Sequence, residues 1–145
     1  MTLDISLVPP ELIDGIEPKV IDKLDTVAAL TNGRYEGIDI LNSVRAGQMQ
    51  LWIIFDTETL EVLSTIATEL KIYPRCKLLC IQDCTGDPFR TSSVWDRMTQ
   101  TLERFAAAEG CIGVEFSGRP GWGKHFELHD YRKIPRASYE KFFEE

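Results

Sequence analysis

Four cysteines, Cys76, Cys80, Cys84 and Cys111, are the side chains with the widest chemical repertoire in this sequence. The first three are spaced four residues apart, in a segment rich in β-forming residues. On a strand, four residues span about 13 Å at ~3.3 Å each, whereas thiolates on one zinc ion lie within about 4 Å of one another. The spacing therefore excludes a zinc site shared by these three and favours buried free thiols in a reducing compartment.

The glycine-rich segment 118–125, GRPGWGKH, matches the phosphate-binding P-loop pattern except at its last position. His125 stands where a serine or threonine would hold magnesium, and Pro120 lacks a backbone donor. Only 21 residues follow Lys124, too few for the rest of a nucleotide-binding sheet. The segment indicates a tight strand-to-helix turn, and a P-loop nucleotide hydrolase ranks third among the functions considered.

Two histidines, His125 and His129, lie one helical turn apart and could in principle share a zinc ion. The zinc-protease pattern requires a glutamate directly after the first histidine, whereas Glu127 comes two places on. A histidine near the carboxyl end of a helix is also stabilised by the helix dipole without any metal. We therefore expect no metal site.

Hydroxyl and basic side chains surround the start of a helix predicted after residue 90. Arg90, Ser92 and Ser93 could hold an anion at the helix N-terminus. Asp83 and Asp87 in the preceding loop would repel a phosphate, so capping of the helix is the favoured role of the serines.

These residues must be positioned by a set of helices and strands that the hydrophobic pattern predicts. Helices are expected at 18–31, 36–46, about 92–109 and about 124–129, and strands at 49–55, 60–73, 76–82, 111–117 and within 131–143. The first three strands should form an antiparallel meander, and the strand–helix–strand unit over 76–117 should be a parallel crossover. The fold class is therefore α/β, with a mixed, mostly antiparallel sheet flanked by helices.

Length and charge restrict the possible partners. The 145 residues suit one domain, 1–145, and the net charge of -7 makes nucleic acid a poor partner. The longest apolar run, Leu51 to Phe55, is far shorter than the ~20 residues of a membrane span. The first residues carry no cationic start and no long apolar stretch, so no signal peptide and no membrane association are expected.

Both the order of elements and three short sequence segments resemble a known family. The segments are GQMQLWI (47–53), ATELKIYPR (67–75) and CIGVEFSGRPGW (111–122). The order of elements resembles the GNAT N-acetyltransferase fold over most of the chain. The strings resemble those of small GNAT-like proteins encoded by tailed bacteriophages. The resemblance implies transfer of an acetyl group from acetyl-CoA to an amine.

The resemblance also implies a loop that cradles the pyrophosphate, and this loop aligns from Gln82. Thr85 and Asp87 then occupy the two positions usually held by small residues, and Gly86 is out of register. The residues that would contact the cofactor are Gln82, Gly86, Arg90, Ser92 and Ser93. The departure from the loop pattern predicts weak binding of acetyl-CoA.

The catalytic positions that the resemblance implies are also altered. Phe126 stands where the family has a proton-donating tyrosine, and Arg119 stands where it often has an asparagine. Glu69 could act as the base by its position only. A surface for a substrate or partner is expected at Tyr73, Arg75, Arg119 and Trp122. A hairpin with solvated charges explains Tyr73 and Arg75 equally well, and a core role that anchors the last helix explains Trp122 slightly better.

The expected function is that of a phage-encoded GNAT-fold protein, non-catalytic or weakly catalytic, that binds protein in virion assembly or host takeover. Its partners would be other phage proteins, a host protein or a second copy of the chain, in the host cytoplasm or the virion. The alternative is an acetyl-CoA-dependent N-acetyltransferase acting on a small amine or a protein amine.

Overall fold

A five-stranded sheet lies at the centre of the computed structural model, which describes residues 2–84 and 92–143. Its strands are β1 (Leu3–Val8), β2 (Gln50–Asp56), β3 (Val62–Ile72), β4 (Lys77–Cys84) and β5 (Gly113–Phe116), in that spatial order. The helices are α1 (Ile13–Ala28), α2 (Gly37–Arg45), α3 (Ser92–Ala108) and α4 (Gly123–Glu127). Short 3-10 turns lie at η1 (Pro10–Leu12), η2 (Ala29–Thr31) and η4 (Pro120–Trp122).

The sheet is mixed and mostly antiparallel. Strands β1 to β4 pair antiparallel with their neighbours, and β5 pairs parallel with β4. The helix α3 connects β4 to β5, because a parallel pair needs a crossover connection. The predicted α/β class, the meander and the parallel pair are therefore confirmed.

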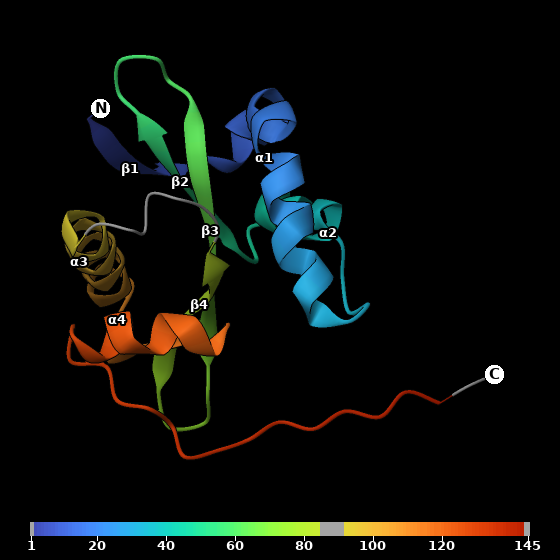
Figure 1. Ribbon diagram of the computed structural model, residues 1–145, viewed down its shortest axis with the longest axis vertical. Coiled ribbons are helices and arrows are strands. Elements are labelled where there is room, and N and C mark those ends of the chain that lie inside the picture. The colour runs from blue at the N-terminus through green and yellow to red at the C-terminus, as the bar shows by residue number, and fades with distance from the viewer. Residues whose placement is uncertain (1, 85–91, 144–145) are drawn as a thin grey trace.

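Each face of the sheet is covered by two helices, so the molecule has three layers (Figure 1). One hydrophobic cluster lies between the sheet and α3 and α4, and it includes Trp95, Met98 and Leu102 at helical spacing. The other lies between the sheet and α1 and α2, and it includes Leu24 and Leu41. No helix in the described part of the chain combines the length and apolar character needed to cross a membrane.

Two elements near the N-terminus differ from the prediction. The strand β1 was not expected, because its six residues show only partial alternation and a single buried side chain, Val8. The helix α1 begins at Ile13 rather than at Pro18, which lies inside it. Ile13 is fully buried beside Val20 and Leu24, so packing fixes the start of this helix despite the internal proline.

The predicted strand within 131–143 is wrong. Every residue from Arg132 to Phe143 is exposed, and none of them belongs to a strand. The segment leaves α4, passes beyond the end of the sheet and reaches the side of α1 and α2 (Figure 1). There the Glu140 carboxylate accepts hydrogen bonds from Asn32 at 2.6 Å and Arg34 at 2.7 Å. Because its side chains bury nothing, no packing holds it against the sheet as a strand.

Candidate functional site

The parallel pair β4–β5 separates at its carboxyl end. Its register runs from Leu78 opposite Gly113 to Ile81 opposite Phe116, and the Ser117 N–H donates to the Ile81 carbonyl at 3.2 Å. Beyond this point β4 continues to Cys84 without a β5 partner. A side chain then joins the two strand ends, because Arg119 donates from Nη2 to the Cys84 carbonyl at 2.5 Å.

An irregularity in β4 lies at the same end. Ile66 pairs with Cys84 and Thr68 with Ile81, so three residue steps on β4 oppose two on β3. This β-bulge falls between Ile81 and Cys84 and bends the strand where it loses β5. Bulges are frequent next to active sites because they redirect side chains and end strand pairing.

Aromatic side chains hold η4 and α4 against α3 near the carboxyl end of β4. The buried Trp95 ring of α3 stacks on His125 at 4.6 Å and contacts the rings of Trp122 and Phe126, each at 5.2 Å. The Arg119 guanidinium lies over the Trp122 ring at 5.0 Å. Arg119 is therefore held by an aromatic face as well as by the Cys84 carbonyl.

Two residues of the predicted cofactor set can be placed, one in β4 and one in α3. Gln82 is half-buried, with its Nε2 3.8 Å from the Cys80 Sγ, and Ser93 is exposed in the first turn of α3. Gly86, Arg90 and the side chain of Ser92 lie outside the described residues. The cradle that the loop would form for a pyrophosphate remains a prediction.

A row of polar side chains crosses the other face of the sheet. Glu69 of β3 is in register with Cys80 of β4, which is in register with Glu115 of β5. Leu79 and Ile81 belong to the cluster under α3, so Cys80, which lies between them, faces the α1/α2 side. Neighbouring strands lie ~4.8 Å apart, so the two carboxylates flank the buried Cys80 thiol.

A hydrogen bond and burial raise the pKa values of two groups at this row, Tyr73 and Cys80. The Tyr73 O–H donates to the Glu115 Oε1 at 2.6 Å, and this bond raises the pKa of Tyr73 to about 12. Burial, reinforced by the charges of Glu115 and Glu69, raises the pKa of Cys80 to about 11. Cys80 is therefore a neutral thiol near pH 7 and a poor nucleophile. The carboxylates are the groups that can bind a cation or accept a proton.

The four residues of the predicted partner surface do not lie together. Tyr73 and Arg75 are in the turn that precedes β4, whereas Arg119 and Trp122 lie at the carboxyl end of that strand. Trp122 is half-buried and packs against the α3 cluster. Glu115 was not singled out from the sequence, although it is the only charged residue in the apolar run CIGVEFS.

Phe126 of α4 and Tyr131, which follows it, are held in the fold by packing and by a hydrogen bond. Phe126 is buried and stacks on Phe116 at 4.2 Å between ring centroids. The Tyr131 O–H donates to Glu103 of α3 at 3.0 Å, and burial raises the pKa of this tyrosine. Both residues anchor α4 in the fold.

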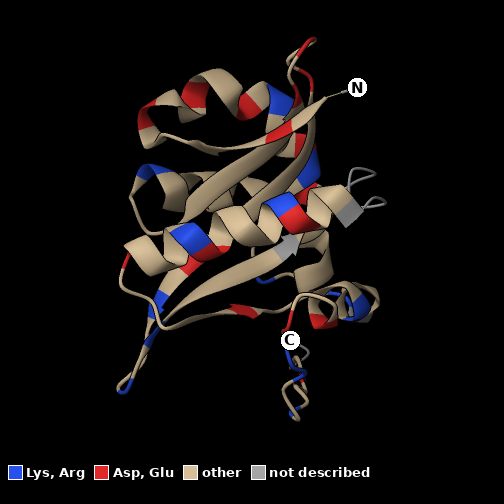
Figure 2. Ribbon diagram, turned by 90° about the vertical axis from the view of Figure 1, so that its left-hand side faces the viewer, with Lys and Arg blue, Asp and Glu red and all other residues tan. Residues whose placement is uncertain are grey.

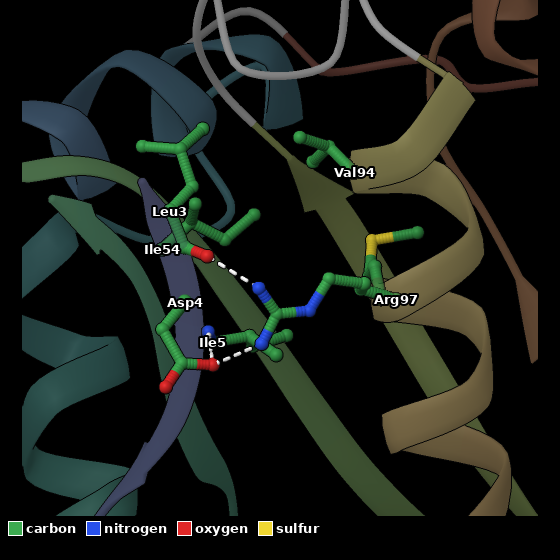
Figure 3. A pocket seen from close by; sticks show the side chains of 7 residues that line it. Leu3, Asp4, Ile5, Ile54, Val94 and Arg97 are labelled. Carbon is green, nitrogen blue, oxygen red and sulfur yellow. Dashed lines mark hydrogen bonds and ion pairs between the residues drawn. The ribbon is translucent and has the colours of Figure 1, made fainter. Parts of the chain in front are cut away.

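Two hollows lie away from these groups. A slot between β1, β2 and α3 has a volume of about 20 Å³, and Arg97 closes it by bonding to the Leu3 carbonyl and the Asp4 carboxylate (Figure 3). This volume accommodates no more than one water molecule. An open hollow of about 420 Å³ lies where α1 ends and α2 begins, next to Gly33 and Tyr35. Within residues 2–84 and 92–143, no three His, Cys, Asp or Glu side chains converge as metal ligands would.

The element order, the mixed sheet and the separated β4–β5 pair define the class of fold, that of the GNAT acetyltransferases. The chain is similar to glucosamine-6-phosphate N-acetyltransferase from Arabidopsis thaliana, with a TM-score of 0.71 and 16% identity over 99% of this chain and 100% of that chain. It is also similar to an acetyltransferase from Trypanosoma brucei, with a TM-score of 0.68 and 13% identity over 97% and 100% of the two chains.

A ribosomal-protein-alanine N-acetyltransferase from Brucella melitensis matches with a TM-score of 0.67 and 9% identity over 99% of this chain and 100% of that chain. No protein-family model and no curated protein sequence matches the chain. At these identities the structural likeness shows the fold.

Proposed function

We propose that this protein is an N-acetyltransferase that moves an acetyl group from acetyl-CoA to an amine. The observation that carries the proposal is the separation of β4 from β5 beyond Ile81, within a fold that matches acetyltransferases along its whole length. The bulge in β4 supports a reaction centre beside this strand, and so does the polar row of Glu69, Cys80 and Glu115, which crosses the sheet one residue before the last β4–β5 pair.

The described residues fit a bound acetyl-CoA at the separated strand ends. Arg119 offers a positive charge there, Gln82 offers an amide, and Ser93 offers a hydroxyl at the first turn of α3. Acetyl-CoA supplies a thioester whose C–S bond breaks as the acceptor nitrogen forms a C–N bond. Glu69 and Glu115 bind the acceptor ammonium, and one of them takes its proton.

The absence of a tyrosine at position 126 is compatible with this chemistry. An ordinary thiol has a pKa near 8.5, so a departing thiolate needs little help from an acid at neutral pH. The neutral Cys80 thiol disfavours an acetylated cysteine on the enzyme, which supports direct transfer to the amine.

The alternative is a protein-binding role without catalysis, as a phage protein in virion assembly or host takeover. It rests on the altered cofactor loop and on Phe126, and the comparisons offer no support for a phage origin. Under this alternative the protein is non-catalytic or weakly catalytic and does not bind acetyl-CoA tightly.

Calorimetry with acetyl-CoA, followed by an assay of coenzyme A release with a panel of amines, tests the proposal. We expect saturable binding and an amine-dependent release of free thiol. Arg119→Ala should weaken binding about 10-fold, equivalent to ~1.4 kcal/mol, whereas Arg75→Ala at the opposite end of β4 should leave it unchanged. No heat of binding at millimolar acetyl-CoA would overturn the proposal and favour the protein-binding alternative.

A further inference from the structure

The segment 132–143, here called the arm, begins beside the edge of the sheet. Phe126 of α4 stacks on Phe116 of β5 at 4.2 Å, and the ring of Tyr131 lies 5.0 Å from the Phe126 ring. The strand β5 is the outermost described strand on this side of the sheet. Tyr131 directly precedes the arm, so it fixes the start of the arm next to β5, on the face that α3 covers.

The far part of the arm is held at the loop between α1 and α2. The Glu140 carboxylate accepts hydrogen bonds from Arg34 at 2.7 Å and from Asn32 at 2.6 Å, and these bonds lower the pKa of Glu140. Arg34 also donates to the Thr31 carbonyl at 2.8 Å, which orients its guanidinium. We call the contact of Glu140 with Arg34 and Asn32 the latch. Because the Arg34 side chain is 53% exposed, the attraction is screened and small, so the latch can open.

Between its two attachments the arm passes from one face of the sheet to the other (Figure 1). Since it begins beside the edge strand β5, its shortest path to the other face leads around that edge. The Arg136 N–H donates to the Ile134 carbonyl at 2.8 Å, which closes a three-residue turn at Pro135. This turn bends the arm between its attachments, and the proline reduces the number of conformations open to the free segment.

The polar row lies on the part of the sheet that the arm rounds. Glu115 of β5 is in register with Cys80 of β4, so both face the side of α1 and α2. Among the described residues, none from β4 or β5 belongs to the cluster under these two helices, so their apolar faces do not cover this part. The Glu115 hydrogen bond raises the pKa of Tyr73, and the positive charge of Arg136 acts against it. Arg136 therefore lies within electrostatic range of the Tyr73–Glu115 pair.

The arm has the charge of an amine substrate. It contains four basic residues and one acidic residue, a formal charge of +3, whereas the whole chain carries -7. Figure 2 shows lysine and arginine positions along the arm. Glu140 is engaged in the latch, so the charges between the two attachments, those of Arg132, Lys133 and Arg136, are all positive. A guanidinium near Glu115 offsets the negative charge that an acceptor ammonium would need.

We propose that the arm is a strap that competes with the acceptor amine for Glu115, with Arg136 as the competing cation and Glu140 as the latch. The inference rests on the proposed function, because it takes Glu115 as a residue that binds the acceptor. Both groups belong to one chain, so the effective concentration of Arg136 near Glu115 is on the order of millimolar. The amine binds to molecules whose latch is open, and its apparent affinity is reduced in proportion to their fraction.

Backbone amide NMR relaxation of the full chain tests the latch without any reaction. Residues 136–140 should have order parameters above ~0.6 in the wild-type chain and below ~0.6 in Glu140→Ala, since lower values mark a flexible backbone. Lys141→Ala is the matched control, because it removes an arm charge beyond the latch and should leave the order unchanged. Circular dichroism checks that each variant is folded. A wild-type arm with the lower values would overturn the proposal.

Titration with butylamine, followed by NMR, tests the competition. An arm closed in about nine of ten molecules weakens the apparent affinity ~10-fold. We therefore expect the butylamine dissociation constant to fall by about this factor in Arg136→Ala and Glu140→Ala and to stay unchanged in Lys141→Ala. In the acetylation assay, KM for butylamine should fall equally while kcat stays the same.

The outcomes separate the strap from the proposed function. No binding of butylamine to any variant, an unchanged or higher dissociation constant in Arg136→Ala, or an equal change in Lys141→Ala would each contradict the strap. The expected changes in order and binding, without acetyl transfer by any variant, would support the strap and contradict the proposed function alone.

Discussion

Two carboxylates flank the Cys80 thiol, and their hydrogen bonds distinguish them. Glu115 accepts the Tyr73 O–H at 2.6 Å. Among the described residues, the half-buried Glu69 carboxylate makes no hydrogen bond or ion pair. Within the proposed reaction we therefore assign the base to Glu69, and the binding of the acceptor to Glu115 with Tyr73.

Replacing Glu69 tests this assignment. Glu69→Gln should lower kcat for acetyl transfer about 10²–10⁴-fold, the usual contribution of a general base, with little effect on acetyl-CoA affinity. The measurement is the rate of coenzyme A release at saturating substrates. Glu58→Gln, an exposed change in the β2–β3 turn, serves as the control. A fully active Glu69→Gln enzyme would remove Glu69 from the mechanism.

A second prediction at the residue scale concerns pH. His129 contacts the Asp96 carboxylate through Nε2 at 2.7 Å and the His125 carbonyl through Nδ1 at 2.8 Å. Both bonds favour the protonated ring, with the carbonyl bond the larger cause, and they raise the pKa of His129. The associated stability is fully present below the unfolded pKa of about 6.5 and is lost as pH rises through the higher folded pKa.

The His129→Gln variant should therefore show a smaller loss of stability with rising pH. Because the Asp96 side chain is 59% exposed, the difference should remain below about 1 kcal/mol between about pH 6 and pH 8. Burial lowers the pKa of the neighbouring His125, which acts in the opposite direction in both proteins. Urea unfolding across this range is the measurement, and parallel pH profiles would contradict the prediction.

At the scale of elements, the contact between α1 and α2 depends on one glycine. The Gly37 N–H donates to the Asp25 Oδ1 at 2.9 Å, and a Cβ on Gly37 would lie 2.5 Å from that oxygen and 3.0 Å from the Asp25 backbone nitrogen. Gly37→Ala should therefore destabilise the protein by about 1–3 kcal/mol through overpacking. Gly15→Ala in α1 is the matched control, because its added methyl meets nothing within 4 Å.

The control should be neutral or more stable by up to ~1 kcal/mol, since alanine favours a helix interior. Chemical denaturation of both variants measures the difference. Equal stabilities would show that α1 and α2 can move apart without loss of free energy.

The elements that the sequence predicted well are those with strong periodic burial. The spacing of Trp95, Met98 and Leu102 predicted α3 and its buried face, and the apolar runs predicted β2 to β5. The strand β1 was missed because pairing with β2, which is distant in sequence, decides its structure. A strand was predicted within 131–143 because the local composition allowed one, whereas residues 132–143 are all exposed in the structure.

For the site residues too, local pattern predicted some positions, whereas contacts between segments distant in sequence decided the others. The resemblance assigned Gln82 and Ser93 to the cofactor; the structure has Gln82 in β4 and Ser93 in the first turn of α3, and their role stays a prediction. The resemblance could not show that Tyr73 and Arg119 lie far apart. Tyr73 precedes the first residue of β4, whereas Arg119 bonds to Cys84, the last residue of that strand. The row formed by Glu69, Cys80 and Glu115 depends on the registers of three strands, and no local pattern contains that information.

At the scale of the whole molecule, one sheet supports two hydrophobic clusters. Strand β2 contributes Trp52 and Ile54 to the cluster under α3 and Leu51 and Ile53 to the cluster under α1 and α2. Loss of either cluster exposes one face of the same strands. We therefore expect the two layers to unfold together, as one cooperative domain.

The tryptophans allow a direct test, because all three belong to one layer. Trp52 and Trp95 lie in the α3 cluster and Trp122 packs against it, so fluorescence reports that layer, whereas far-UV circular dichroism reports every helix. The two signals should give coincident urea transitions. Leu24→Ala, on the opposite side of the sheet, should shift both transitions equally, by about 2–5 kcal/mol. A shift in the dichroism transition without one in fluorescence would mean that the layers unfold independently.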